Sequence, residues 1–194
     1  MLAFQSANLV LAGNFNPYIL SPEWLTNQNI WTPKELRVAV GAVSQDGIQL
    51  NGDGITWIIS SSRLSISSSE TDQCQRLSKS LLEKLPHTPI GAVGITFTFH
   101  NSHRTNDPIC DVISGRLAGH EESTVLFKWG AVLHQDNAQI TSEVVEGSNG
   151  VTSTVHFHRN SNELAETNAS LDRIPADFEV AIGLANTLLM RGED

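Results

Sequence analysis

The sequence predicts an α+β protein built on a largely antiparallel sheet meander. Segments with the two-residue alternation of strands occur in consecutive groups separated by turn sequences, rather than alternating one by one with helical segments. Two other segments, about 70–85 and about 172–190, repeat apolar residues every three or four positions, as amphipathic helices do. No fixed-period repeat and no linker divides the chain, so we expect a single α+β domain over residues 1–194.

The first third of the chain is expected to supply several strands and one short helix. Residues 8–15 read as a strand, and Ser21-Pro22-Glu23 has the order of a helix start, with a capping side chain, a proline at the first helical position and an acid. Residues 36–43, 47–50 and 54–67 are separated by turn sequences rich in Asn, Asp and Gly. These three segments are expected to form a meander of antiparallel strands.

The segment at about 70–85 is expected to be an amphipathic crossover helix. Cys74, Leu77, Leu81 and Leu85 share one face, and Pro86 follows the last of them and ends the pattern. Residues 88–99 then alternate in the manner of a strand that returns the chain to the sheet.

The second half of the chain is expected to begin with a long polar loop at 100–123, a length that is unusual inside a compact domain. Residues 124–133, 138–146 and 151–159 follow as strands, the last two joined by the hairpin sequence Gly147-Ser148-Asn149-Gly150. The C-terminal helix at about 172–190 is expected to pack on the sheet.

Two tryptophans lead to different expectations. Trp57 alternates in phase with isoleucines, so core packing is expected for its ring. Trp31 lies in a turn-rich stretch between Ile30 and Pro33, and we expect its ring to be exposed.

Composition excludes several classes of function. The net charge is −9 with only 12 Lys and Arg residues, which argues against a nucleic-acid partner. No apolar run approaches the ~20 residues that span a bilayer, so no membrane association is expected. The two cysteines are too few for a disulfide framework, and a cytoplasmic location with free thiols is expected. Phosphate-loop, HExxH, GxSxG and CxxC motifs are absent, so no catalytic or cofactor-binding residue is assigned.

One set of histidines raises the question of a metal site. His156 and His158 are two residues apart in a predicted strand and therefore share a face, the more polar one. Two imidazoles can bind Zn²⁺ only with further donors, for which His100 and His103 are the first candidates. Asp107, Cys110 and His120 with Glu121 are further candidates in the same polar loop. The site requires that the strand ending at His100 neighbours the one ending at His158; otherwise these are ordinary polar residues on a sheet.

Residues 57–99, from Trp57 through the strand, the crossover helix and the returning strand to Phe99, resemble sporadically distributed uncharacterised bacterial proteins and, more loosely, SecB-like chaperone folds. The resemblance covers about a quarter of the chain. It implies a sheet-and-helix scaffold that binds extended polypeptide in apolar grooves, typically as an oligomer. The long polar loop after Phe99 departs from that pattern, so no client-binding residue is carried over.

These observations favour a non-enzymatic protein-binding or assembly protein of the bacterial or phage cytosol, chaperone-like and homo-oligomeric. It would bind a partner polypeptide through sheet edges or a helix-covered apolar groove. A metal-dependent hydrolase, with a site built from the 100–122 loop and the His156/His158 strand, is the alternative. A phage structural component is a further one.

Overall fold

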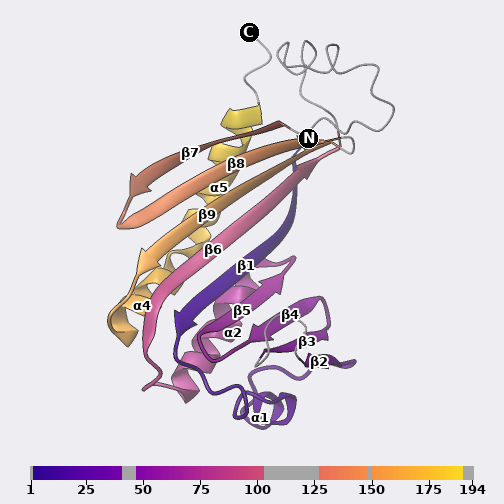
Figure 1. Cartoon of the computed structure of the whole chain (residues 1–194), viewed down its shortest axis with the longest axis vertical. Helices are drawn as coiled ribbons and strands as arrows, with labels where there is room; N and C mark the ends of the chain where they lie inside the picture. Colours follow the sequence, from indigo (N-terminus) through magenta and orange to yellow (C-terminus); the bar gives the residue numbers. More distant parts are fainter. Residues whose placement is uncertain (1, 41–46, 103–126, 148–149, 190–194) are drawn as a thin grey trace.

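The computed structural model describes residues 2–40, 47–102, 127–147 and 150–189, and one antiparallel sheet dominates it (Figure 1). The strands are β1 (Ala3–Gly13), β2 (Arg37–Val40), β3 (Ile48–Gly52), β4 (Ile55–Ile59), β5 (Arg63–Ser68), β6 (Ile90–Asn101), β7 (Phe127–Gln135), β8 (Ala138–Gly147) and β9 (Gly150–Asn160). The helices are α1 (Pro22–Asn27), α2 (Thr71–Lys84), α4 (Leu164–Asp172) and α5 (Ile174–Leu189). The α+β class predicted from the sequence is confirmed.

The order of the nine described strands is β2-β3-β4-β5-β1-β6-β9-β8-β7, and every neighbouring pair is antiparallel. Consecutive hairpins form the groups β2–β5 and β7–β9. The segment 54–67, expected as one strand, is instead two antiparallel strands, β4 and β5, joined by a tight turn at residues 60–62. The N-terminal strand β1 lies between these groups, paired with β5 on one side and β6 on the other. Because β1 separates β5 from β6, helix α2 crosses over it to connect them.

The two helices expected near the N-terminal half are present. In α1, the side chain of Ser21 accepts a hydrogen bond from the backbone N–H of Trp24 at 3.2 Å, which is the predicted cap. Helix α2 buries Cys74, Leu77 and Leu81 against β1 and β5. Burial of the Cys74 thiol raises its pKa to about 12, so it stays protonated and unreactive at neutral pH.

The C-terminal region contains two helices where one was predicted. The helix expected at about 172–190 begins at Ile174 as α5, and α4 precedes it. Helix α4 lacks an apolar stripe, since Leu171 is the only hydrophobic residue among those it buries. It is held by polar contacts instead, including a hydrogen bond from Gln75 Nε2 to the Leu171 carbonyl and an ion pair between Lys79 and Asp172. Hydrophobic periodicity could not reveal a helix held in this way.

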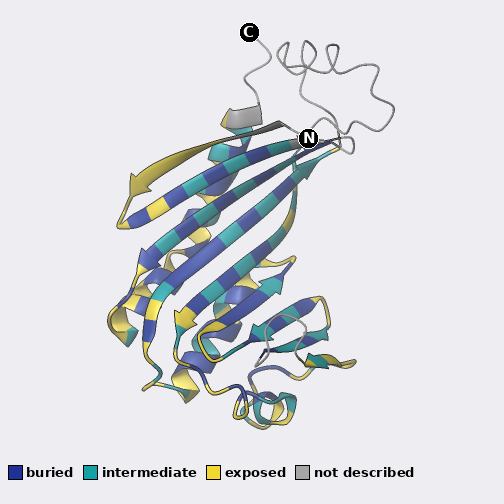
Figure 2. Cartoon of the chain, viewed as in Figure 1, coloured by how far each residue is buried: buried dark blue, intermediate teal, exposed yellow. Residues whose placement is uncertain are grey.

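The core fills the face of the sheet that the helices cover. Along β6 and β9, buried residues alternate with half-buried ones (Figure 2). Phe178 of α5 is the centre of an aromatic cluster, with ring centroids 4.9 Å from Phe4, 5.4 Å from Phe97 and 6.1 Å from Phe99. This cluster fixes α5 across the strands.

The expectation of an exposed Trp31 is wrong. Its ring is buried, with the centroid 6.0 Å from that of Trp57, which is itself fully buried as expected. The segment that follows Trp31 packs directly against the backbone of Gly52. An added Cβ at Gly52 would lie 2.5 Å from the Glu35 carbonyl oxygen and 2.6 Å from Pro33 Cβ. The polar, turn-rich sequence around Trp31 therefore lies against the core rather than away from it.

Among the described residues, no helix combines the length and apolar character that a bilayer span requires.

Candidate functional site

The face of the sheet opposite the helices is polar. The strand register places a single row of side chains across seven neighbouring strands on this face. The row runs from β8 to β3 through Thr141, His156, Thr96, Asn8, Ser67, Thr56 and Asn51. We call this surface the open face.

Side chains of the open face bond to one another. Ser65 and Ser67 each donate to Asn8 Oδ1, at 2.6 Å and 3.1 Å, and Thr56 donates to Asn51 Oδ1 at 2.9 Å. The open face is therefore a hydrophilic surface whose polar side chains largely hydrogen-bond to one another, rather than an apolar groove.

His156 and His158 both lie on the open face. Both are half-buried, as are Thr152 and Thr154, whereas Val155 and Phe157 are buried on the helix-covered side. The centroids of the two imidazole rings are 6.3 Å apart. Strand periodicity was therefore sufficient to assign the face of the pair.

His100 does not join this pair, even though its strand is the neighbour of theirs. Because β6 and β9 are antiparallel, His100 lies opposite Thr152 and His158 lies opposite Gly94. Six residues of strand separate these two positions, roughly 20 Å at 3.4 Å per residue. His100 Nδ1 is instead 3.4 Å from Thr152 Oγ1.

The remaining candidate ligands, His103, Asp107, Cys110, His120 and Glu121, lie outside the described residues. Within the described ranges, no group of three or more His, Cys, Asp or Glu side chains is arranged to hold a metal ion. The described part of the chain thus brings together two of the four predicted histidines.

The imidazole ring of His156 packs closely against residues of the neighbouring strand. Its Nδ1 is 2.9 Å from Thr96 Oγ1, and an added Cβ at Gly94 would lie 3.0 Å from its Cε1, so Gly94 makes room for the ring. Burial lowers the pKa of His156, and the nearby His158 lowers it further. The neutral imidazole is therefore favoured.

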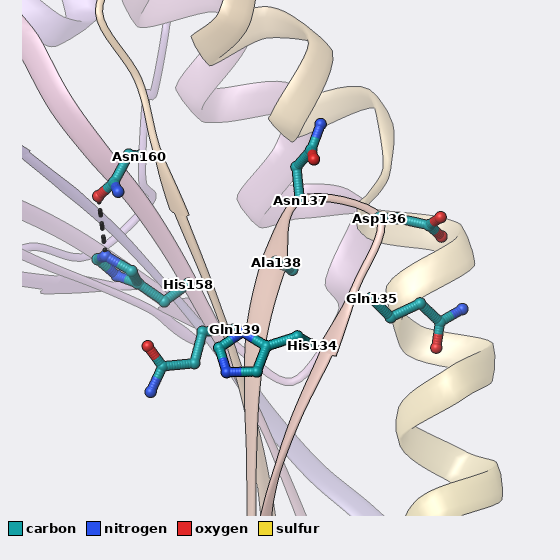
Figure 3. Close-up of a pocket in the computed structure, with 8 residues that line it drawn as sticks. All are labelled: His134, Gln135, Asp136, Asn137, Ala138, Gln139, His158 and Asn160. Atoms are coloured by element: carbon teal, nitrogen blue, oxygen red, sulfur yellow. Dashed lines mark hydrogen bonds between the residues drawn. The ribbon is translucent and has the colours of Figure 1, made fainter.

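A polar pocket of about 430 Å³ opens at the β7–β8 turn (Figure 3). His134, Gln139 and His158 occupy one row across β7, β8 and β9 and project to the same side of the sheet. His158 Nε2 lies 3.3 Å from Asn160 Oδ1. Asp136 in the turn points away from them and pairs with Arg173 at 2.6 Å. The pocket offers imidazole and amide groups for hydrogen bonding.

His134 was not singled out from the sequence. The available signal was the turn at Asp136-Asn137, whose residues have φ of 50° and 61° and form a two-residue hairpin loop. That loop places His134 opposite Gln139. Placing Gln139 opposite His158 also requires the register of β8 on β9, which the local sequence does not show.

Exposed apolar side chains gather at the two edges of the sheet. Of the seven large hydrophobic residues exposed in the described chain, five lie on or directly beside an edge strand. They are Leu36, Val38 and Val40 at β2, and Val132 and Leu133 at β7. The other two, Tyr18 and Ile19, precede α1.

The two edges differ in length and regularity. Strand β2 has only four residues. Strand β7 has nine, and its register on β8 runs unbroken from Phe127 opposite Glu146 to Gln135 opposite Ala138, so it contains no bulge. Every residue from Gly130 to Gln135 is exposed, including Val132 at 58% and Leu133 at 41%.

Comparisons of the chain with models of known protein families and with curated proteins find no match. The resemblance of residues 57–99 to SecB-like folds remains a prediction.

Proposed function

We propose that this protein binds polypeptide by strand addition at β7 and acts as a binding or assembly protein. The observation that carries the proposal is the state of this edge: nine residues long, regular, apolar at Val132 and Leu133, and unpaired on its outer side within the described residues. An edge of this kind presents a row of backbone N–H and C=O groups to an incoming strand.

The edge lacks the features that usually prevent such pairing. Soluble proteins protect exposed edges with proline, bulges, short strands or several charged residues. Residues 127–135 contain no proline, and Lys128 is their only Lys, Arg, Asp or Glu. The shorter strand β2, by contrast, is limited to four residues.

Other described surfaces support the proposal less well. The open face is polar and its side chains bond to one another, as at Asn8 and Thr56. The helix-covered face is filled by the core, with Phe178 packed among Phe4, Phe97 and Phe99. Of the two surfaces expected to bind a partner, the sheet edge is therefore favoured over the helix-covered groove.

A strand-forming peptide tests the proposal directly. The probe is a fluorescein-labelled peptide with the sequence of residues 127–135, and its matched control carries N-methyl groups at alternate residues, which remove the donors of one edge. We expect the probe to raise fluorescence anisotropy with wild-type protein, and the methylated peptide to bind at least tenfold more weakly.

Two lysine substitutions localise the binding. Val132→Lys places a charge on β7 and should abolish probe binding, whereas Val40→Lys makes the same change at the β2 edge and should leave it intact. Both side chains are exposed, so neither variant should lose fold, which circular dichroism checks. Equal binding of the two peptides, or equal loss in both variants, would refute strand addition at β7.

A further inference from the structure

We infer, building on the proposed function, that the strand added at β7 is β7 of a second copy of this chain. The two strands run antiparallel, related by a two-fold axis at Ala131, and the two sheets become continuous. Because each copy presents the same edge, the contact is closed and stops at a dimer.

The register follows from the length of the strand. In an antiparallel two-fold pair, a residue can lie opposite its own copy only at the axis, and residues opposite each other share a face of the sheet. Strand β7 spans residues 127–135, so all nine residues pair only when Ala131 is at the axis. Any other centre leaves residues at one end of each copy's strand unpaired.

The residues of β7 are self-complementary in this register. Small residues, Gly130 and Ala131, occupy the centre, with bulky ones to each side. Val132 lies opposite Gly130 of the second copy, where no side chain opposes it. Leu133 lies opposite position 129 of the second copy, on the same face of the sheet.

The helix layer leaves room for the contact. Helix α5 packs on β6, β8 and β9. Leu133 of the edge strand β7 remains exposed on the side of the sheet that the helices cover. Two copies joined at β7 therefore meet along a line that their α5 helices flank, and pairing covers Leu133.

Charge does not oppose the contact at the edge. The chain carries a net charge of −9, which disfavours close approach of two copies elsewhere. Strand β7 itself has no Asp or Glu, and in the full-length register Lys128 lies opposite His134 rather than opposite another Lys. Asp136, which follows β7 in the chain, is paired with Arg173 within its own copy. Glu143 lies one strand inside the edge, opposite Gly130 on β8, and is half-buried.

Mass and cross-linking test the dimer and its register. Light scattering coupled to size-exclusion chromatography should give twice the chain mass for wild-type protein and Val40→Lys, and a monomer for Val132→Lys. For cross-linking, Ala131→Cys is introduced together with Cys110→Ser, so that the buried Cys74 is the only other thiol. Opposed residues of antiparallel strands have Cα atoms about 4.5–5.5 Å apart, which suits a disulfide.

Mild oxidation should convert most Ala131→Cys protein to a covalent dimer that reducing agent reverses. Val40→Cys in the same background is the matched control at the other edge and should remain monomeric. Cross-linking of Ala131→Cys no faster than Val40→Cys, or a monomeric wild-type mass at millimolar concentration, would overturn the dimer. A monomer that still binds the strand peptide would retain the proposed function and lose only this inference.

Discussion

At the scale of single residues, one ion pair among the described residues is buried in the interior, and side-chain periodicity does not predict it. Arg159 of β9 makes two hydrogen bonds to Asp177 of α5, at 2.6 Å and 2.7 Å, and both side chains are less than a tenth exposed. The guanidinium also lies 5.8 Å from the centre of the Phe157 ring. The pair connects the sheet to the C-terminal helix.

Removing one partner should leave an uncompensated buried charge. We expect Asp177→Ala to lower the free energy of unfolding by about 3–5 kcal/mol, as for other buried pairs. The exposed pair of Arg173 and Asp136 provides the control, and Asp136→Ala should cost about 0–1 kcal/mol. Urea unfolding monitored by circular dichroism measures both, and equal losses would contradict this role of the buried pair.

His156 should make stability depend on pH. Its pKa is lowered in the folded state by burial and by His158, so the unfolded chain binds more protons as the pH falls below about 6.5. Stability is therefore retained above that value and is lost as the pH falls through the folded pKa. We expect His156→Gln to reduce the slope of melting temperature against pH between pH 7 and pH 5.

His87→Gln, at an exposed position, serves as the matched His-to-Gln control. If His156→Gln and wild type lose stability in parallel over this range, protonation of His156 does not contribute.

At the scale of elements, the β8–β9 hairpin depends on one glycine. Gly150 has φ of 112°, and an added Cβ would lie 2.2 Å from the Asn101 carbonyl oxygen at the end of β6. The hairpin is thereby fitted against β6, which pairs with β9. A side chain at this position would strain the backbone and also push β6 away.

Gly150→Ala should therefore lower stability more than a Gly→Ala change at a site where only the φ angle is unfavourable. Gly54 has φ of 75° with nothing within 4 Å of an added Cβ, so Gly54→Ala should cost about 1–2 kcal/mol from conformation alone. We expect a clearly larger fall in melting temperature for Gly150→Ala, measured by calorimetry. A smaller fall at Gly150 would mean that the contact with Asn101 relaxes freely.

At the scale of the whole molecule, β1 joins the two halves of the sheet. Leu9 lies opposite Ile66 of β5 on one side and opposite Ile95 of β6 on the other, and all three are buried. The groups β2–β5 and β6–β9 therefore share one core through the N-terminal strand.

Leu9→Ala should destabilise the entire chain by about 2–5 kcal/mol, as is typical of a buried Leu→Ala change. Because β1 links the halves, tryptophan fluorescence measured in a Trp129→Phe background, which keeps Trp24, Trp31 and Trp57 of the first half, should change together with the circular dichroism signal of the whole sheet. Val10→Ala, on the half-buried open face, should cost less. Separate transitions in the Trp129→Phe protein would show that the halves unfold independently.

Local sequence patterns determined much of this protein: the α+β class, the helix at 71–84, the hairpins β2–β3, β3–β4 and β8–β9, and the face on which His156 and His158 lie. These depend on side-chain periodicity, caps and turns, which act over a few residues. Tertiary structure alone decided the central place of β1, the polar helix α4, the burial of Trp31, the distance between His100 and His158, and the position of β7 at an edge. Each of these depends on pairing or packing between residues far apart in the chain, where the stabilising partner is absent from the local sequence. The row His134–Gln139–His158 and the exposed edge at Val132 were therefore visible only once the strands were in order.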